Sequence, residues 1–339
     1  MKKIYIITDY RGLYRQGISR CRGININVIK EIFAKNGYEV ALTSYSEIIN
    51  GDINKIQNAY IFYTSSESLE YKEYIKDIMY ELGKRNRLIP GYDMLMCHED
   101  KCYQEIYKKS RGITSLEAEC FGSVSELRQR SDTFTYPVIL KKYSGAGSIS
   151  VYKADNKKQL LKIARKMNRN SEYYLYYARL LVKCLKKNLD SEYTKDDPYL
   201  GRILVQEFVP DLQNDWKVLI FGKKVYCLYR GIRDNDFRAS GSGKFKYVKP
   251  PVQILDFAMA VFEKMQVPFL SLDLCMNDKK QVYLIEFQGL HFGPYTLIHS
   301  QQYYVKEDNK WIEKIEKSDL SREYANAVVE YIERLEYSI

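Results

Sequence analysis

The chain has 339 residues, of which 45% are hydrophobic and 28% are charged, and a formal net charge of +10. This is the composition of an ordinary globular protein, long enough to bury a core in two or three lobes. No run of about 18 apolar residues occurs, as a membrane span requires. The start "MKKIYIITD" lacks the long apolar segment of a signal peptide, so we expect a cytoplasmic protein without a membrane span.

The cysteines argue against disulfide bonds and a zinc site, and the net charge indicates the kind of partner. Seven cysteines without a CxxC pair indicate reduced, buried thiols rather than a disulfide framework. The two cysteines of "CHEDKC", Cys97 to Cys102, would face different ways on a helix, which does not fit a zinc site. The positive charge favours anionic partners. Because the lysines are spread along the chain beside acids, without a basic tail, we do not expect nucleic acid among them. A homo-oligomer is left open.

The first ninety-five residues alternate strand and helix patterns. Strands are predicted at 2–10, 38–45, 58–66 and 86–92, and helices at 23–37 and 71–83. This alternation predicts a parallel sheet covered by helices, in an α/β domain over residues 1–95.

The segment after the first strand, "DYRGLYRQGISRCRG", lies where such sheets bind ligands. It either holds an anionic substrate or forms a solvated loop. The candidate residues are Arg11, Arg15, Arg20 and Arg22.

A second unit follows, over residues 96–205, with helices predicted at 98–112 and 156–168. Between them, "YPVILKKYSGAGSISVYK" reads as a strand that ends in two lysines, a loop of small residues and a returning strand. The loop is either a hairpin turn or a flap whose bare backbone N–H groups close over a polyphosphate. No Gly-Lys pair is followed by Ser or Thr, which excludes a Walker A loop, and the returning strand excludes a dinucleotide fingerprint.

The segment "SEYYLYYARLLVKCLKKN", residues 171–188, has an apolar face at helical spacing and a basic opposite face. Such a helix binds an acidic membrane or partner, or packs on its own domain. We expect it to pack on its own domain.

A β-rich lobe over residues 206–339 contains the hairpin "PFLSLDLCMNDKKQVYLIEFQ". A four-residue turn at 277–280 would pair Ser271 with Glu286 and Asp273 with Leu284. Because side chains alternate along a strand, Ser271, Asp273, Leu284, Glu286 and Gln288 would then share one face. Asp273 and Glu286 would be diagonal neighbours, roughly 7 Å apart at the backbone.

Two carboxylates and an amide on one face of an apolar hairpin need a positive partner. Magnesium fits, because it prefers oxygen ligands and takes one or two carboxylates together with substrate phosphates. The alternative is that Asp273 and Glu286 pair with Arg or Lys of a neighbouring strand.

The order of these patterns resembles the ATP-grasp superfamily of carboxylate-amine ligases, most closely the group of ribosomal-protein glutamate ligases and glutathione synthetases. The likeness runs from about Asp100 to Pro294 and rests on "DK", the strand lysine with its small-residue loop, "VQEFV", the Arg-rich β segment and the "D…E-x-Q" hairpin. It implies a fold with an N-terminal Rossmann-like domain and two α+β lobes, and it implies ATP and Mg²⁺ as cofactors. Two magnesium ions are expected, with Mn²⁺ as an alternative metal.

The resemblance also implies residue roles. The residues implied to contact phosphate are Lys101, Lys141 and the flap Ser144, Gly145, Ala146, Gly147 and Ser148. Those implied to contact adenine and ribose are Glu207, Phe208, Val209 and Asp211. Stabilisation of the transferring phosphate falls to Arg238, with Arg230 as a second candidate, and metal ligation to Asp273, Glu286 and Gln288. The family usually has Asn where Gln288 stands, and "ASGSGKFKYV" after Arg238 lacks the usual Asn and paired glycines.

The implied reaction joins a carboxylate to an amine through an acyl phosphate. Anionic substrates are expected, and the acceptor is an acidic glycan, an amino acid or a peptide, with modification of a surface polysaccharide as one pathway. His291 and His299 follow the hairpin and either touch substrate or are structural, and we expect them to be structural. The alternative functions are a small-molecule kinase of the same architecture and a non-catalytic ATP-binding regulator.

Overall fold

The computed structural model describes residues 2–16, 23–113, 115–145, 150–169, 171–186, 192, 197–234 and 236–337. The chain divides into two compact units. The large unit consists of Met1–Glu99, Tyr107–Ser115 and Asp211–Ile339, and the small unit of Asp100–Ile106 and Leu116–Pro210. The N-terminal and C-terminal parts of the chain thus fold together in the large unit.

The predicted parallel sheet is present in the large unit. It consists of β1 (Lys2–Thr8), β2 (Tyr38–Ser44), β3 (Tyr60–Phe62) and β4 (Arg87–Ile89), in the order β2-β1-β3-β4. Its helices are α1 (Ile26–Lys35), α2 (Tyr45–Asn50), α3 (Leu69–Gly83) and α4 (Tyr92–Cys97), with a short 3-10 turn, η1 (Ile53–Lys55). The strand order reverses between β1 and β3, and ligands bind at the carboxyl ends of strands at such a point.

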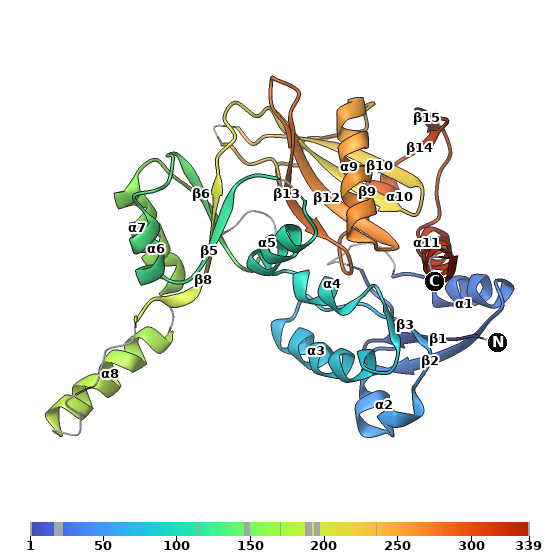
Figure 1. The fold of residues 1–339 in the computed structure, drawn as a ribbon, viewed down its shortest axis with the longest axis horizontal. Helices are drawn as coiled ribbons and strands as arrows, with labels where there is room; N and C mark the ends of the chain where they lie inside the picture. The colour runs from blue at the N-terminus through green and yellow to red at the C-terminus, as the bar shows by residue number, and fades with distance from the viewer. Residues whose placement is uncertain are drawn as a thin grey trace. The chain divides into compact units, whose positions relative to one another are not determined.

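The large unit also contains an antiparallel sheet (Figure 1). Its strands, in the order β13-β12-β9-β10-β14-β15 with β11 beside β10, are β9 (Asn214–Phe221), β10 (Lys224–Gly231), β11 (Phe245–Lys246), β12 (Phe269–Met276), β13 (Val282–Gln288), β14 (Tyr303–Glu307) and β15 (Lys310–Lys314). The helices of this part are α9 (Val252–Met265), α10 (Tyr295–His299) and α11 (Leu320–Tyr337).

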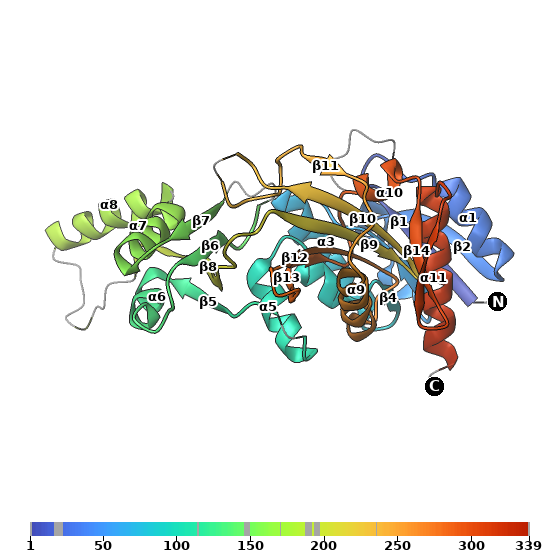
Figure 2. The same ribbon diagram turned by 90° about the horizontal axis from the view of Figure 1, so that it is seen from above.

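One apolar core joins the two sheets of the large unit. It contains Ile6 and Phe62 of the parallel sheet together with Phe221, Phe269 and Tyr324. The Tyr324 ring lies 4.9 Å from that of Phe221 and 4.7 Å from that of Phe269, between centroids. Both ribbon views place α11, which carries Tyr324, beside α1 (Figure 1; Figure 2). Each such aromatic side chain contributes about 1.5–3 kcal/mol by burial, so the first and last parts of the chain stabilise each other.

The small unit has its own antiparallel sheet and core. The strands β5 (Ala118–Ser123), β6 (Val138–Lys142), β7 (Val151–Ala154) and β8 (Leu200–Glu207) are arranged as β5-β8-β6-β7. The core packs α6 (Val124–Arg130) and α7 (Lys157–Asn168) on this sheet, and α5 (Lys101–Ser110) begins in this unit. The returning strand expected after the small-residue loop is β7, so the loop joins two hydrogen-bonded strands.

The helix at 171–188 is present as α8 (Ser171–Leu185), but it does not bury its apolar face. Among its described side chains, from Tyr174 onward, Leu180 is buried and Tyr176 is half-buried, and the others are exposed. The prediction that this face packs on its own domain is therefore wrong. No helix in the described residues has the length and apolar character that a bilayer span needs.

Candidate functional site

The hairpin of β12 and β13 differs in register from the prediction. Asn277 and Gln281 close the turn through a backbone bond of 3.0 Å and a bond of 2.9 Å from Gln281 N–H to Asn277 Oδ1, which shifts the pairing by one residue. A bulge beside Asp273 then shifts it again. As a result Asp273 lies directly opposite Glu286, not diagonal to it, and the two Cβ atoms are about 5 Å apart. The bulge brings the two carboxylates closer than the sequence predicted.

The bulge also changes which residues share the acidic face. Leu284 pairs with Leu274, which puts it on the opposite face, so the prediction for Leu284 is wrong. Ser271 pairs with Gln288. Directly paired side chains point the same way, so Ser271, Asp273, Glu286 and Gln288 lie on one face.

Charged side chains continue across the sheet from this face. We call Asp215, Lys217, Arg230, Asp273 and Glu286 the acid–base row, because register pairs Arg230 with Asp215, Lys217 with Asp273, and Asp273 with Glu286. Arg230 donates to both oxygens of Asp215, at 2.5 and 2.8 Å, and its Nη2 lies 3.0 Å from Asp273 Oδ2. Lys217 Nζ donates to Asp273 Oδ1 at 2.8 Å. Pairing of Asp273 with cations of neighbouring strands, the alternative left open above, is thus present.

The electrostatics of the row follow from burial and these contacts. Burial disfavours the charged form of Asp273, but Arg230 and Lys217 outweigh it and hold the pKa of that carboxyl well below its usual range. Burial raises the pKa of Asp215 to about 6 against the opposing attraction of Arg230. Arg230 keeps its charge, because both carboxylates raise its pKa against the effect of burial. Asp273 therefore stays an anion over the physiological range.

The side-chain oxygen atoms of Asp273, Glu286 and Gln288 fit a magnesium ion. Among the described residues there is no cluster of three His, Cys, Asp or Glu side chains that could hold a metal. The candidate ligands here are two carboxylates and one amide. Gln288 is 8% exposed, and within the described chain its Oε1 has no hydrogen-bond partner; the same is true of Ser271 Oγ, directly across the hairpin. Each Asp273 oxygen has a second lone pair left after its bond to a cation. Magnesium accepts one or two carboxylates and neutral oxygens, so these residues suit it.

The small unit holds the two lysines predicted to contact phosphate. Lys141, 5% exposed on β6, donates from Nζ to Gln206 Oε1 at 2.6 Å. Lys101, 6% exposed at the start of α5, donates from Nζ to the carbonyl of Gly145 at 2.9 Å, and its backbone N–H bonds the carbonyl of Tyr143. Lys101 thus lies beside the first residues of the loop that follows Lys141.

Only the first part of the predicted flap is described, namely Ser144 and Gly145. Gly145 has a φ of +118°, a conformation that side chains disfavour. The predicted flap residues Ala146, Gly147 and Ser148 lie outside the described residues, as do Arg20 and Arg22.

The other predicted nucleotide and phosphate contacts have these positions. Glu207 ends β8 and is exposed, Phe208 lies under Lys153 Nζ at 4.8 Å from the ring centroid, Val209 is half-buried, and Asp211 is exposed with a φ of 57°. Arg238 lies in the segment after β10, where its Nη2 bonds Asp236 Oδ2 at 2.6 Å. Arg238 lowers the pKa of Asp236, so both groups are charged.

A buried polar cluster lies at the carboxyl ends of β1 and β3, where the strand order reverses. We call it the histidine cluster, and it consists of Thr64, Lys72, His98 and His291. His291 Nδ1 lies 2.9 Å from Thr64 Oγ1, its ring is 5.0 Å from that of His98, and Lys72 Nζ donates to the His98 carbonyl at 3.2 Å. In the described structure His98 Nδ1 lacks a hydrogen-bond partner.

Burial sets the protonation of these imidazoles. It lowers the pKa of His291 to about 4, with Arg15 as a second cause, and it lowers the pKa of His98 as well. Both rings are neutral at pH 7. Arg11, by contrast, is held by Asp9, which accepts from its Nε at 3.1 Å, and His299 is an exposed residue whose ring lies 4.2 Å from that of Tyr295.

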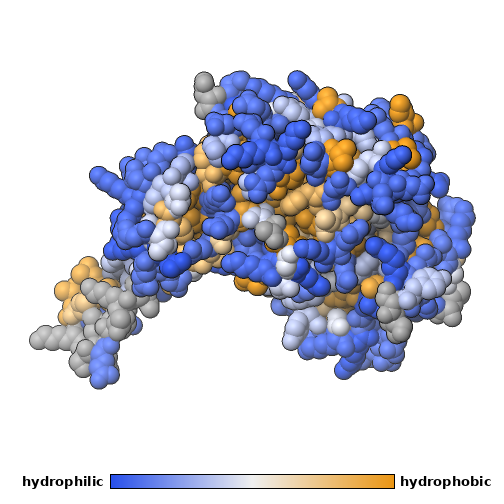
Figure 3. All heavy atoms as spheres, turned by 45° about the horizontal axis from the view of Figure 1, so that its top comes forward, coloured by the Kyte–Doolittle hydropathy of each residue, from blue (hydrophilic) through white to orange (hydrophobic). Residues whose placement is uncertain are grey.

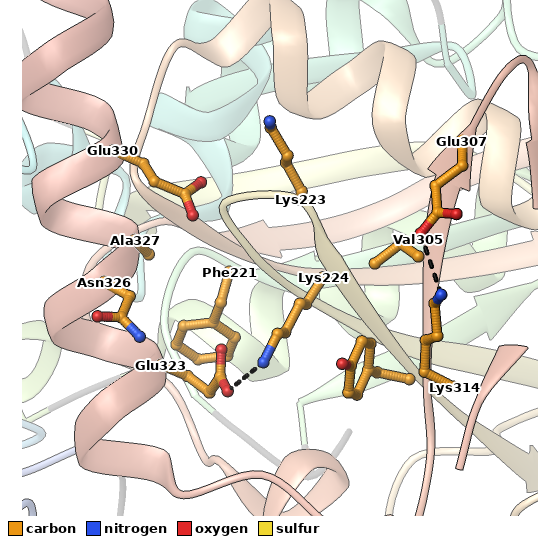
Figure 4. A pocket seen from close by; sticks show the side chains of 11 residues that line it. Phe221, Lys223, Lys224, Val305, Glu307, Lys314, Glu323, Asn326, Ala327 and Glu330 are labelled. Carbon is orange, nitrogen blue, oxygen red and sulfur yellow. Dashed lines mark hydrogen bonds and ion pairs between the residues drawn. The ribbon is translucent and has the colours of Figure 1, made fainter. Parts of the chain in front are cut away.

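A cavity of about 260 Å³ lies elsewhere in the large unit, lined by residues of β9, β10, β14, β15 and α11 (Figure 4). Two ion pairs lie among its charged residues: Lys224 with Glu323 at 2.7 Å and Lys314 with Glu307 at 3.1 Å. None of the residues predicted to bind nucleotide or metal lines it. The candidate residues therefore form two separate groups, the acid–base row in the large unit and the two lysines in the small unit.

Sequence reasoning missed Asp215, Lys217 and Gln206. Asp215 and Lys217 alternate with Trp216 in the otherwise apolar "DWKVLIF", a period-two pattern of charges that indicates a polar stripe on a buried strand. Gln206 stands inside the quoted "VQEFV" and carried no separate signal. The histidine cluster could not be predicted from the sequence, because its residues are far apart along the chain.

No family model and no curated protein matches this sequence. The structure is similar to that of the D-cycloserine synthetase DcsG, with a TM-score of 0.55 and 12% identity over 97% of this chain and 99% of that one. It is also similar to a RiPP-associated ATP-grasp ligase of Chryseobacterium gregarium in complex with ADP and a leader and core peptide, with a TM-score of 0.53 and 12% identity over 97% of both chains.

A third similar structure is the ADP complex of an N5-carboxyaminoimidazole ribonucleotide synthetase, with a TM-score of 0.52 and 11% identity over 89% of this chain and 73% of that one. At these identities the likeness concerns the fold. The chain has the ATP-grasp fold, as its sequence patterns predicted.

Proposed function

We propose that the protein is an ATP-dependent carboxylate-amine ligase. The observation that carries the proposal is the pair Asp273 and Glu286, directly opposite each other on an ATP-grasp fold and flanked by the buried oxygen of Gln288. The similar structures include proteins described as ligases or synthetases, two of them solved with ADP, which supports ATP as the nucleotide.

The chemistry requires activation of a carboxylate. A carboxylate resists attack by an amine because oxide would have to leave, whereas an acyl phosphate made from ATP loses phosphate readily. Catalysis then depends on positioning and charge neutralisation. Asp273, Glu286 and Gln288 would hold magnesium, which neutralises phosphate charge, with Mn²⁺ as a substitute.

Basic side chains would bind the phosphates themselves. Lys101 and Lys141 are buried and fixed by hydrogen bonds to Gly145 and Gln206, so little ordering remains when they contact phosphate. Arg238 would stabilise the transferring phosphate, with Arg230 as the second candidate.

The histidine cluster is our candidate for the carboxylate substrate. It lies at the carboxyl ends of β1 and β3. Its buried Lys72 donates to the His98 carbonyl, and His98 Nδ1 has no hydrogen-bond partner in the described structure. Arg15, whose charge acts on His291, adds a positive field. These groups suit a small anionic carboxylate such as an acidic amino acid, the end of an acidic peptide or a uronic acid of a glycan.

One observation favours a rival, the non-catalytic ATP-binding regulator. Lys217 and Arg230 already neutralise Asp273, so its carboxylate has a structural partner without any metal. A small-molecule kinase is the other alternative, and it would transfer phosphate to a hydroxyl and need no amine.

Thermal unfolding with ATP and Mg²⁺, compared with ATP and EDTA, tests the nucleotide site without knowledge of the substrate. Ligand at a hundred times its dissociation constant adds about 2.7 kcal/mol of stability. We expect this shift for the wild type, and its loss in Lys141→Ala and Glu286→Ala. Lys142→Ala is the matched control, because Lys142 is the exposed neighbour of Lys141 on the same strand. Equal shifts in all four proteins would contradict the proposal.

Product analysis then separates the three functions. A ligase releases ADP and phosphate only when both a carboxylate and an amine are present, and a kinase forms a phosphoester without an amine. A regulator binds nucleotide and makes neither product.

A further inference from the structure

The helix α8 exposes an apolar face that the proposed ligase chemistry does not use. The exposed fractions are 53% for Leu175, 62% for Leu181, 49% for Val182 and 75% for Leu185. Leu181 and Leu185 are one helical turn apart, and Leu175 and Val182 are two turns apart, so they form one continuous stripe. Figure 3 shows apolar residues on the surface of this helix, at the lower left of the view.

A basic stripe runs along the same helix. Arg179 and Lys183 are one turn apart, and Lys186 follows at the next turn, where its backbone N–H bonds the Val182 carbonyl at 3.0 Å. All three are exposed. From Tyr173 to Leu189 the sequence has four Lys or Arg residues and no Asp or Glu. At 100° per residue the basic stripe flanks the apolar one rather than interrupting it.

The basic stripe beside the apolar one indicates which kind of partner binds this helix. A second copy of the chain would bring another basic helix and another net charge of +10 against it, which opposes association. An anionic surface attracts both. Amphipathic helices that lie in a membrane interface have leucine and aromatic residues on the apolar face and Lys or Arg on the polar face, and tyrosine is frequent at that depth.

We propose that α8 docks the protein on the surface of an anionic lipid bilayer. The stripe of Leu175, Leu181, Val182 and Leu185 enters the boundary between head groups and acyl chains, and Arg179, Lys183 and Lys186 contact the anionic head groups. Each basic residue near such a surface strengthens binding by about fivefold. The inference does not rest on the ligase proposal, since it uses none of the nucleotide, metal or substrate residues.

Co-sedimentation with vesicles tests the inference. The full chain is mixed with vesicles of phosphatidylcholine alone or of phosphatidylcholine with phosphatidylglycerol, at low and high salt. We expect binding to the anionic vesicles, at least tenfold weaker binding to the neutral ones, and weakening by salt. The double variant Leu181→Asp/Leu185→Asp should bind at least tenfold more weakly than the wild type, and Arg179→Gln/Lys183→Gln should lose most of the preference for anionic vesicles.

The matched control is Leu69→Asp/Ile315→Asp, which makes the same change of charge at apolar residues that are 47% and 84% exposed elsewhere. Its affinity for the anionic vesicles should be within about twofold of the wild-type affinity, after correction for its two added negative charges. Circular dichroism and the melting temperature without ligand report whether each variant is folded.

Three outcomes would overturn the inference. The wild type could fail to bind anionic vesicles, or the control could lose as much binding as the α8 variant, which would indicate attraction by net charge alone. In the third outcome the wild type does not bind vesicles and is a dimer by light scattering, and the α8 variant is a monomer. The helix would then be an interface between copies of the chain.

Discussion

Arg230 contacts two carboxylates at once, with its Nε 2.5 Å from Asp215 Oδ1 and its Nη2 3.0 Å from Asp273 Oδ2. Arg230 and Asp215 are 8% and 7% exposed, so water screens the group little. Such a buried arrangement adds little net stability, but removing one partner leaves an uncompensated charge. The structural and proposed catalytic properties of Asp273 thus depend on the same guanidinium.

We predict that Arg230→Met lowers the free energy of unfolding by about 3–5 kcal/mol, since two carboxylates lose their shared cation. Urea denaturation at pH 7 measures the loss. The control is Lys157→Ala, which removes an ion pair with Asp132 whose side chains are 43% and 74% exposed and should cost at most about 1 kcal/mol. An Arg230 variant as stable as this control would show that the row does not depend on its arginine.

Metal binding should depend on the oxygen of Gln288. We expect Gln288→Leu to lose most of the Mg²⁺-dependent part of the nucleotide thermal shift, because its side chain fills the space without an oxygen ligand. Gln288→Asn retains an amide oxygen and should keep part of it. The control is Gln281→Leu, at an exposed position of the same hairpin. If Gln288→Leu responds to EDTA as the wild type does, Gln288 is not a ligand.

Acid should destabilise the protein through its buried histidines. His291 has a pKa of about 4 in the folded chain and about 6.5 when unfolded, so the unfolded chain binds more protons between these values and stability is lost as the pH falls through this window. For His291 alone the loss from pH 7.5 to pH 5 is about 2 kcal/mol.

The measurement compares urea unfolding of the wild type and His291→Asn at these two pH values. The raised pKa of Asp215, about 6, acts in the opposite sense, because the folded chain then holds the extra proton. Subtracting the two proteins cancels the contribution of Asp215, and it cancels that of His98 only in part, because His291 also lowers the pKa of His98. A difference near zero would contradict the neutral, buried state of His291.

The sequence predicted the elements better than their contacts. Alternating apolar patterns predicted β1, β2 and the strands of the hairpin, because side-chain burial on each face is local information. The bulge lies beside Asp273 on β12, which pairs with β13 on one edge and with β9 on the other, and no local pattern contains it. The same limit applies to α8: its apolar stripe predicted burial, but the partner of that stripe is absent from the described chain.

For the candidate site, too, individual residues could be predicted from the sequence but their contacts could not. Lys141, Asp273 and Glu286 could be singled out because charge inside apolar strands is costly and needs a reason. Their partners Gln206 and Lys217 come from strands distant in sequence, and pairing of such strands depends on the tertiary fold. The histidine cluster joins residues from 64 to 291, so only the structure brings them together.

The last prediction concerns the proposed carboxylate site. Arg15 acts on the buried His291, whereas Arg11, on the same segment, is held by Asp9. We expect that one of L-glutamate, L-aspartate or galacturonate adds a further thermal shift to the wild type with nucleotide and Mg²⁺ present. That shift should disappear in Arg15→Gln and Lys72→Met and persist in Arg11→Gln, while all variants keep the shift given by nucleotide alone. Loss of the carboxylate response in Arg11→Gln but not in Arg15→Gln would move the substrate away from the histidine cluster, because the anion would then follow the exposed arginine rather than the buried imidazoles.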